Sequence, residues 1–144
     1  MSGILIFAGT ADGRCLAEHL SSRGLDVHVR VATEYGAVVM EGDGVDVEVG
    51  SLGGTEGIAD EVSRRGYELV VDATHPYARA VSQHIREGCA KAGVECIRLV
   101  RDGGQVPEGV IEVPDVQSAV EFLSGTTGTI FAATGAKELE AYVS

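Results

Sequence analysis

The fold is decided by the stretch Leu69-Val-Val-Asp-Ala-Thr-His-Pro-Tyr-Ala78. Its first three residues form a short apolar run, which is typical of a strand buried in a parallel sheet. Asp72 and a polar turn follow, and turns after such strands lie at the edge of the sheet where ligands bind. Pro76 fixes one backbone angle and favours an extended conformation at His75. We therefore expect this turn to carry a functional site.

Similar apolar runs and helical spacings extend along the chain on both sides of this stretch. The predicted strands span residues 3–8, 25–31, 67–72, 94–100 and 129–133, and the predicted helices span residues 12–23, 55–65, 78–92 and 115–123. Strands that alternate with helices predict an α/β fold, with a doubly wound, mostly parallel sheet flanked by helices in the Rossmann-like manner.

Residues 37–40 and 45–49 are two further β-like pieces. The turn Glu41-Gly-Asp-Gly44 between them favours a hairpin. The second piece could instead join the main parallel sheet, and the pattern does not choose between the two arrangements.

The first predicted strand leads into the turn Gly9-Thr-Ala-Asp-Gly13. Gly9 permits a tight turn, and Asp12 could cap the following helix, whose open N–H groups suit a phosphate. The turn lacks the full G-x-G-x-x-G spacing of dinucleotide-binding proteins. From these residues alone, a nucleotide site and a plain strand-to-helix turn are equally good interpretations.

The end of the second predicted strand bears on which nucleotide would bind. Arg30 and Thr33 favour NADP, since an arginine at this place suits the 2′-phosphate. Glu34 supports the alternative, because an acidic residue there would bind the ribose hydroxyls of NAD or cap the next turn. Arg30 could also be a solvated charge at the sheet edge.

The composition limits the partners. The 144 residues include 22 acidic side chains against 11 lysines and arginines, so the formal net charge is −11. This charge opposes broad binding to nucleic acid or to an anionic membrane, and no apolar run approaches the roughly 18 residues of a membrane span. No charged and apolar leader precedes Gly3, so we expect a soluble, cytoplasmic protein. Cys15, Cys89 and Cys96 form no C-x-x-C pair and are expected to be buried.

Three motifs together resemble the precorrin-6A reductase family of cobalamin biosynthesis. They are Asp72-Ala-Thr-His-Pro-Tyr-Ala78, Ile6-Phe-Ala-Gly-Thr-Ala-Asp-Gly-Arg14 and Ala32-Thr-Glu-Tyr-Gly36. The resemblance implies an NADPH-dependent oxidoreductase that reduces an anionic tetrapyrrole, the precorrin-6A or cobalt-precorrin-6A macrocycle. A non-catalytic nucleotide-binding domain or a structural domain is the alternative.

Expected roles follow for individual residues, and no metal ligands are among them. The catalytic candidates are Thr74, His75 and Tyr77; the cofactor-binding candidates are Gly9, Thr10, Asp12, Gly13, Arg14, Arg30, Thr33, Thr134 and Gly135; the substrate-binding candidates are Arg79, Arg98, Arg101 and Lys137. Because the chain is acidic overall, the carboxylates of a tetrapyrrole would need a local group of arginines. Arg86 is a further candidate for that group, although any one of these arginines could simply be solvated.

The last predicted strand and its Thr134-Gly135 turn repeat the order of the first strand, glycine turn and helix. We expect residues 1–127 to form an N-terminal Rossmann-like domain. Residues 128–144 would then be the first βα unit of a second, truncated domain, or the closing unit of the first. The resemblance implies two similar domains with the cofactor between them, so a C-terminal domain or a partner chain would complete the cleft.

Other site classes are disfavoured. Short-chain dehydrogenases need a lysine four residues after a tyrosine, whereas valine follows Tyr35, Tyr67 and Tyr77 at that spacing. Cys15 and His19 lie four residues apart on an apolar helix face, but two ligands without a third make a poor zinc site. There is no G-x-S-x-G elbow of a hydrolase. His84 is expected to be a packed core histidine.

Overall fold

The structure is a computed structural model that describes residues 3–40, 45–100 and 105–143. Contacts divide the chain into two compact units, Met1–Asp102 and Gly103–Ser144. The domain boundary expected after residue 127 stays a prediction, because contacts within one structure do not measure which segment folds independently.

The first unit contains a five-stranded parallel sheet. Its strands are β1 (Ile4–Ala8), β2 (Val27–Val31), β3 (Asp46–Val49), β4 (Leu69–Ala73) and β5 (Glu95–Arg98). All neighbours pair in parallel, in the order β3-β2-β1-β4-β5. The predicted α/β fold with a doubly wound parallel sheet is confirmed.

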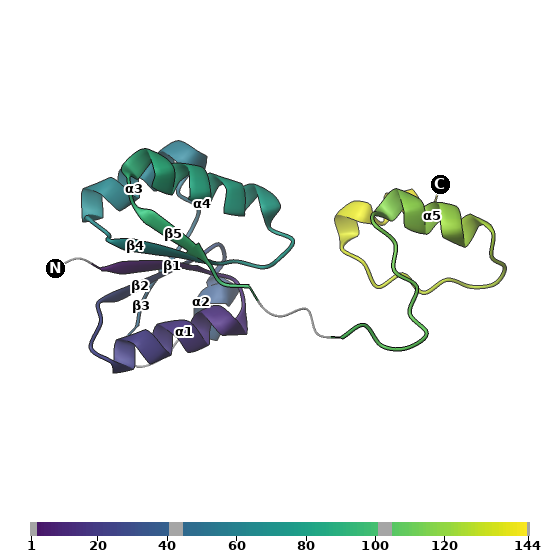
Figure 1. The fold of residues 1–144 in the computed structure, drawn as a ribbon, viewed down its shortest axis with the longest axis horizontal. Helices are drawn as coiled ribbons and strands as arrows, with labels where there is room; N and C mark the ends of the chain where they lie inside the picture. The colour runs from purple at the N-terminus through teal and green to yellow at the C-terminus, as the bar shows by residue number, and fades with distance from the viewer. Residues whose placement is uncertain (1–2, 41–44, 101–104, 144) are drawn as a thin grey trace. The chain divides into compact units, whose positions relative to one another are not determined.

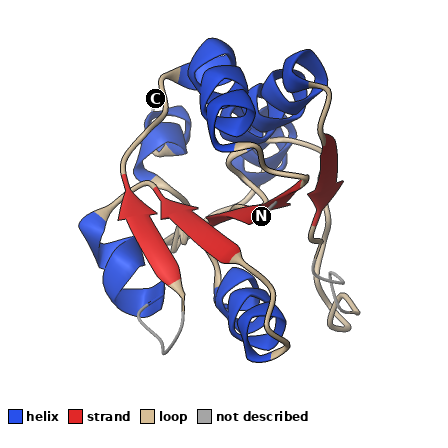
Figure 2. Ribbon diagram, turned by 90° about the vertical axis from the view of Figure 1, so that its left-hand side faces the viewer, coloured by secondary structure: helices blue, strands red, loops and turns tan. Residues whose placement is uncertain are grey.

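Helices cover both faces of this sheet (Figures 1 and 2). They are α1 (Ala11–Ser22) and α2 (Glu34–Met40) on one face, and α3 (Gly54–Arg65) and α4 (Arg79–Ala92) on the other. Ile6 of β1 packs into the core on the α1 side, whereas Leu5 and Phe7 pack with α3 and α4. Because both faces are buried, β1 and β4 are almost continuously apolar and do not alternate.

Of the two arrangements left open for residues 37–49, the hairpin is not formed, and the β-like assignment of residues 37–40 is wrong. Residues 37–40 belong to α2, and β3 joins the parallel sheet beside β2. The Thr33 hydroxyl accepts a hydrogen bond from the Gly36 nitrogen at 3.1 Å, and the Thr33 carbonyl accepts one from Ala37 at 3.1 Å. These bonds form the first helical turn, and so short an apolar run cannot itself distinguish helix from strand. The turn expected at residues 41–44 lies outside the described residues.

Two expectations about buried side chains are also wrong. His84 is exposed, because α4 buries Ile85 and Cys89 and leaves His84 outside the core. Cys15 is exposed as well, whereas Cys89 is buried and Cys96 half-buried.

The second unit contains α5 (Val116–Ser124), the 3-10 helix η1 (Ala136–Glu138) and α6 (Glu140–Val143). The predicted helix at residues 115–123 is confirmed, and the Asp115 carboxylate caps it by accepting a bond from the Ser118 nitrogen at 2.7 Å. The strand expected at residues 129–133 is wrong. No described strand pairs with this run, and a strand needs such a partner for its backbone groups. Phe131 is 92% exposed.

Candidate functional site

The site expected after β4 lies at the point where the strand order reverses. From β1 the chain proceeds outward to β2 and β3, and then returns to β4 on the other side of β1. Ala8 and Ala73, the last residues of β1 and β4, are paired in register. The two turns that follow therefore start side by side, at the place where doubly wound sheets bind ligands.

Contacts between the two turns are close. The Thr10 hydroxyl donates a hydrogen bond to the Ala73 carbonyl at 3.4 Å. A Cβ added to Gly9 would lie 3.4 Å from the His75 nitrogen, so glycine allows the two backbones to approach. A Cβ on Gly13 would lie 3.1 Å from the Cβ atoms of Ala8 and Ala73. Gly13 thus lets α1 pack closely on the sheet, as the last glycine of a dinucleotide-binding turn does.

The start of α1 suits an anion. Thr10 is the N-cap residue and its side chain makes no cap bond, so it does not occupy the first N–H groups of the helix, which are donors that suit an anion. The cap expected at Asp12 is wrong, since Asp12 lies within the first turn. It lines a hollow of about 550 Å³ beside α1 together with Cys15 and Leu99. Arg14 Nε pairs with Glu18 of the same helix at 2.9 Å.

Asp72 organises the turn after β4. Its Oδ1 accepts hydrogen bonds from the Thr74 nitrogen at 3.0 Å and the Thr74 hydroxyl at 2.6 Å. Its Oδ2 lies 2.5 Å from Nη1 of Arg98, which is its register partner on β5. The same Nη1 donates to the Ser82 hydroxyl at 2.7 Å. One buried carboxylate therefore connects the turn, α4 and β5.

These contacts decide the charge of Asp72. Burial alone would raise the pKa of this carboxyl group, but hydrogen bonds from Thr74, Ser82 and Arg98 outweigh burial and lower it. Asp72 and Ser82 are not among the site residues expected from the sequence. The available signal was a carboxylate that ends an apolar strand and is followed by a hydroxyl residue two positions later.

The same turn presents His75 and Tyr77. The Tyr77 nitrogen donates to His75 Nδ1 at 3.2 Å, and the two ring centres are 5.1 Å apart. Since Nδ1 accepts this bond, the proton of the neutral imidazole is on Nε2. Tyr77 is 84% exposed. The turn thus offers an N–H donor and an open aromatic ring at the edge of the sheet.

Arg79 and Arg98 lie around one hollow of about 440 Å³, which Arg86 and Asp72 also line. Two of the four predicted substrate-binding residues are therefore brought together. Arg101 lies outside the described residues.

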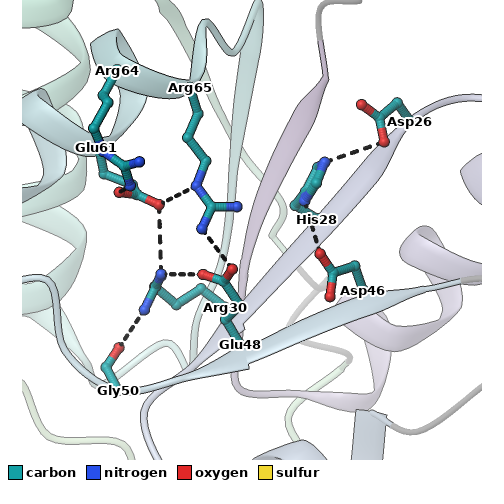
Figure 3. Close-up of polar contacts among 9 residues, drawn as sticks. All are labelled: Asp26, His28, Arg30, Asp46, Glu48, Gly50, Glu61, Arg64 and Arg65. Carbon is teal, nitrogen blue, oxygen red and sulfur yellow. Dashed lines mark hydrogen bonds and ion pairs between the residues drawn. The ribbon is translucent and has the colours of Figure 1, made fainter.

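Arg30 has a different environment. Its guanidinium lies 2.5 Å from Glu48 and 3.6 Å from Glu61, and it donates to the Gly50 carbonyl at 3.4 Å (Figure 3). Thr33 is exposed beyond the end of β2, where its hydroxyl holds the start of α2. A role for Arg30 in cofactor binding stays a prediction, and it would require this arginine to leave its carboxylate partners.

The remaining predicted residues belong to the second unit. Gly135 precedes η1, which contains Lys137, and Thr134 lies just before it. Their roles stay predictions.

Within the described residues, no group of three His, Cys, Asp or Glu side chains could hold a metal ion. None of the helices that the structure describes, in either unit, is long and apolar enough to cross a membrane.

Comparison with known proteins identifies the family. The model of the family described as Precorrin-6x reductase CbiJ/CobK matches residues 3–144. The chain belongs to the precorrin-6x reductase family. Precorrin-6A reductase of Rhodobacter capsulatus is 30% identical over 96% of this chain, and cobalt-precorrin-6A reductase of Priestia megaterium is 30% identical over 96%. The chain covers 55% and 54% of these two proteins, so this family member spans about half of their length.

Two solved structures are similar to the chain. CobK precorrin-6A reductase matches with a TM-score of 0.71 at 28% identity, over 84% of this chain and 47% of that one. The UDP-glucose 4-epimerase of Thermus thermophilus, solved in complex with NAD, matches with a TM-score of 0.55 at 22% identity, over 76% of this chain and 42% of that one. The second likeness shows a shared fold alone.

Proposed function

We propose that this member of the precorrin-6x reductase family forms the nucleotide-binding part of an NADPH-dependent reductase. Its substrate would be the precorrin-6A macrocycle, with or without cobalt, and its product the dihydro macrocycle. The observation that carries the proposal is the close approach of the Gly9 turn to the Thr74–His75 turn at the reversal of strand order. In doubly wound sheets, the edge at the reversal of strand order is the place where a dinucleotide binds.

The residues at this edge fit such a cofactor. NADPH supplies a hydride for an unsaturated carbon of the ring, and the protein supplies binding and orientation. Gly9 lets the first turn pack against the backbone of the Thr74–His75 turn, and the N–H groups at the start of α1 would bind the pyrophosphate. Asp72 accepts hydrogen bonds from both the nitrogen and the hydroxyl of Thr74, and these bonds would hold Thr74 in place for the catalytic role predicted for it.

His75 and Tyr77 would face the reacting ring systems. Nε2–H of His75 would donate a hydrogen bond to an acceptor on the cofactor or macrocycle, and the exposed ring of Tyr77 would pack on a flat ring. Arg79 and Arg98 would attract the carboxylates of the substrate. A C-terminal domain or a partner chain would provide the opposite wall, and the cofactor- and substrate-binding roles of Thr134, Gly135 and Lys137 stay predictions. Orienting two reactants in this way lowers a barrier by about 7–11 kcal/mol.

Cofactor choice is tested by calorimetric titration with NADPH and NADH. We expect tighter binding of NADPH, and we expect Arg30→Met to remove the difference. Equal affinity of the unsubstituted chain for both would contradict a 2′-phosphate site. A preference that survives Arg30→Met would leave Thr33 to carry it.

Catalysis is tested by following NADPH oxidation with precorrin-6A and with cobalt-precorrin-6A. The chain alone should turn over slowly, and addition of the C-terminal half of the Rhodobacter capsulatus relative should raise the rate. Nucleotide binding without turnover in either mixture would favour the alternative, a non-catalytic nucleotide-binding domain. Rapid turnover by the chain alone would refute the need for a second wall.

A further inference from the structure

The hollow beside the start of α4 has an unusual charge for this chain. Three arginines line it, Arg79, Arg86 and Arg98, and Asp72 is its one carboxylate among the described residues. Asp72 is already matched by Arg98. The hollow is therefore cationic, although the chain as a whole has a net charge of −11.

Arg79 and Arg86 are exposed on α4 and have no ion pair within the described residues. The nearest acidic neighbour in sequence is Glu87, whose carboxylate accepts hydrogen bonds from Gln83 at 2.8 Å and from Thr55 at 3.1 Å. That acid is therefore held by other side chains. Cys96 also lines the hollow, and burial raises the pKa of its thiol, so it adds no negative charge near neutral pH.

The start of α4 adds to this positive potential. Ala78 occupies the N-cap position and provides no side-chain bond to the first N–H groups of the 14-residue helix. The positive end of the helix dipole therefore lies at Arg79, the first residue of α4, whose guanidinium has no ion pair in the part of the chain that the structure describes.

We propose that this hollow binds carboxylates on the rim of a flat polycarboxylate, with Arg79 and Arg86 as the two binding cations and Arg98 as a fixed support. The proposal rests on the proposed function, in which the substrate is an anionic tetrapyrrole, and it names where the acidic side chains of that substrate bind.

Spacing favours several carboxylates over one phosphate. Arg79 and Arg86 are seven residues apart, which is two helical turns on one face and about 10 Å along the axis. Two cations at that separation match separate acidic groups along the rim of a ring, whereas a single phosphate would be reached by one of them. Arginine also forms paired hydrogen bonds with a carboxylate.

The test is calorimetric titration of the 144-residue chain, at low salt, with benzenehexacarboxylate as a rigid flat polycarboxylate and with pyrophosphate as a compact phosphate. The variants are Arg79→Gln, Arg86→Gln and the double variant. Arg23→Gln is the matched control, because Arg23 is also exposed and has no ion pair among the described residues but lies at the end of α1. Melting temperatures and NADPH affinities are measured for all chains.

We expect each single variant to lower the affinity for the polycarboxylate by about tenfold, as loss of one charge-assisted hydrogen bond predicts. The double variant should abolish the binding, and Arg23→Gln should leave it unchanged. Equal binding in all chains, or an equal loss in Arg23→Gln, would overturn the proposal. So would tighter binding of pyrophosphate, or a matching loss of NADPH affinity in Arg86→Gln, because the hollow would then be a nucleotide phosphate site. If the unsubstituted chain does not bind NADPH, the proposed function is refuted. The effect of the arginine variants on polycarboxylate binding would still stand.

Discussion

Two groups of arginines in the first unit have opposite surroundings. Arg30, Arg64 and Arg65 surround Glu48 and Glu61, and each arginine is paired with at least one of these carboxylates (Figure 3). We call these five residues the matched cluster. In the hollow beside α4, three arginines face one described carboxylate, that of Asp72, which pairs with Arg98 alone. Arginines therefore form internal ion pairs in the matched cluster, whereas in the hollow part of their positive charge is not compensated by the described carboxylates.

The matched cluster has a structural cause. On the face covered by α3 and α4, β1 contributes Leu5 and Phe7 to the core. On the same face β2 and β3 carry Arg30 and Glu48, which are register partners near the end of the sheet. Arg65 of α3 reaches Glu48 at 2.6 Å. Paired charges thus complete the packing between α3 and the sheet beyond the apolar core.

Breaking the ion pairs of the matched cluster should lower the free energy of unfolding more than the other changes do. Glu61 is 8% exposed, and Glu61→Gln would leave Arg30 and Arg65 with one carboxylate between them. We expect the free energy of unfolding to fall on the order of 3 kcal/mol, since three arginines lose the charge of a shared buried carboxylate and the largely buried Arg30 keeps only one acidic partner. Urea unfolding checks this, with Asp60→Asn on the exposed side of α3 as the control. A loss no larger than that of the control would show that the cluster is only a surface feature.

Removing the Asp72 carboxylate from the hollow should have a smaller effect on stability. It should also make the hollow more positive, and so increase its difference in charge from the matched cluster. We expect Asp72→Asn to cost about 2 kcal/mol at pH 7, because the hydrogen bonds from Thr74 and Arg98 lose a charged acceptor. The affinity for benzenehexacarboxylate should rise at the same time, since Arg98 is no longer neutralised.

The pH dependence of this variant has a definite sign. The pKa of Asp72 is lowered by folding from its ordinary value of 3.8. Its contribution is therefore complete above pH 3.8 and is lost as the pH falls through the lower folded pKa. Unfolding at pH 7 and at about pH 3 should show the gap between the unsubstituted chain and Asp72→Asn shrinking at the lower pH. A constant gap would mean that Asp72 acts by its shape and not by its charge.

The smallest effect is expected at His75, which belongs to neither group of arginines. The amide of His75→Asn can replace Nδ1 as acceptor for Tyr77, whereas that of His75→Gln reaches toward the place of Nε2. If Nε2–H contacts the ligand, His75→Asn should weaken NADPH or substrate binding about fivefold, and His75→Gln should lose less. The melting temperature should be unchanged in both, because His75 is exposed. The opposite order of the two variants would assign the role to the shape of the turn.

Local pattern predicted much of the first unit because its elements obey local rules. The apolar run before Asp72 became β4, and the helix expected over residues 78–92 ends at Gly93, whose φ of 70° suits glycine. The segment at residues 37–40 was predicted incorrectly, because hydrogen bonds at Thr33 decided for a helix where periodicity could not. The run at residues 129–133 has β-like side chains but no described strand as a partner.

From the sequence alone follow the strands β1, β2, β4 and β5, the turns after β1 and β4, and the chemical groups that those turns carry. Only the tertiary structure decided which charges meet. Arg30 and Arg98 both lie near the carboxyl end of a strand. Arg30 is enclosed by Glu48 and Glu61, whereas Arg98 pairs with Asp72 beside two arginines that have no ion pair within the described ranges. The physical reason is that an ion pair depends on distances of a few ångströms between residues far apart in the chain, and strand order and helix packing set those distances.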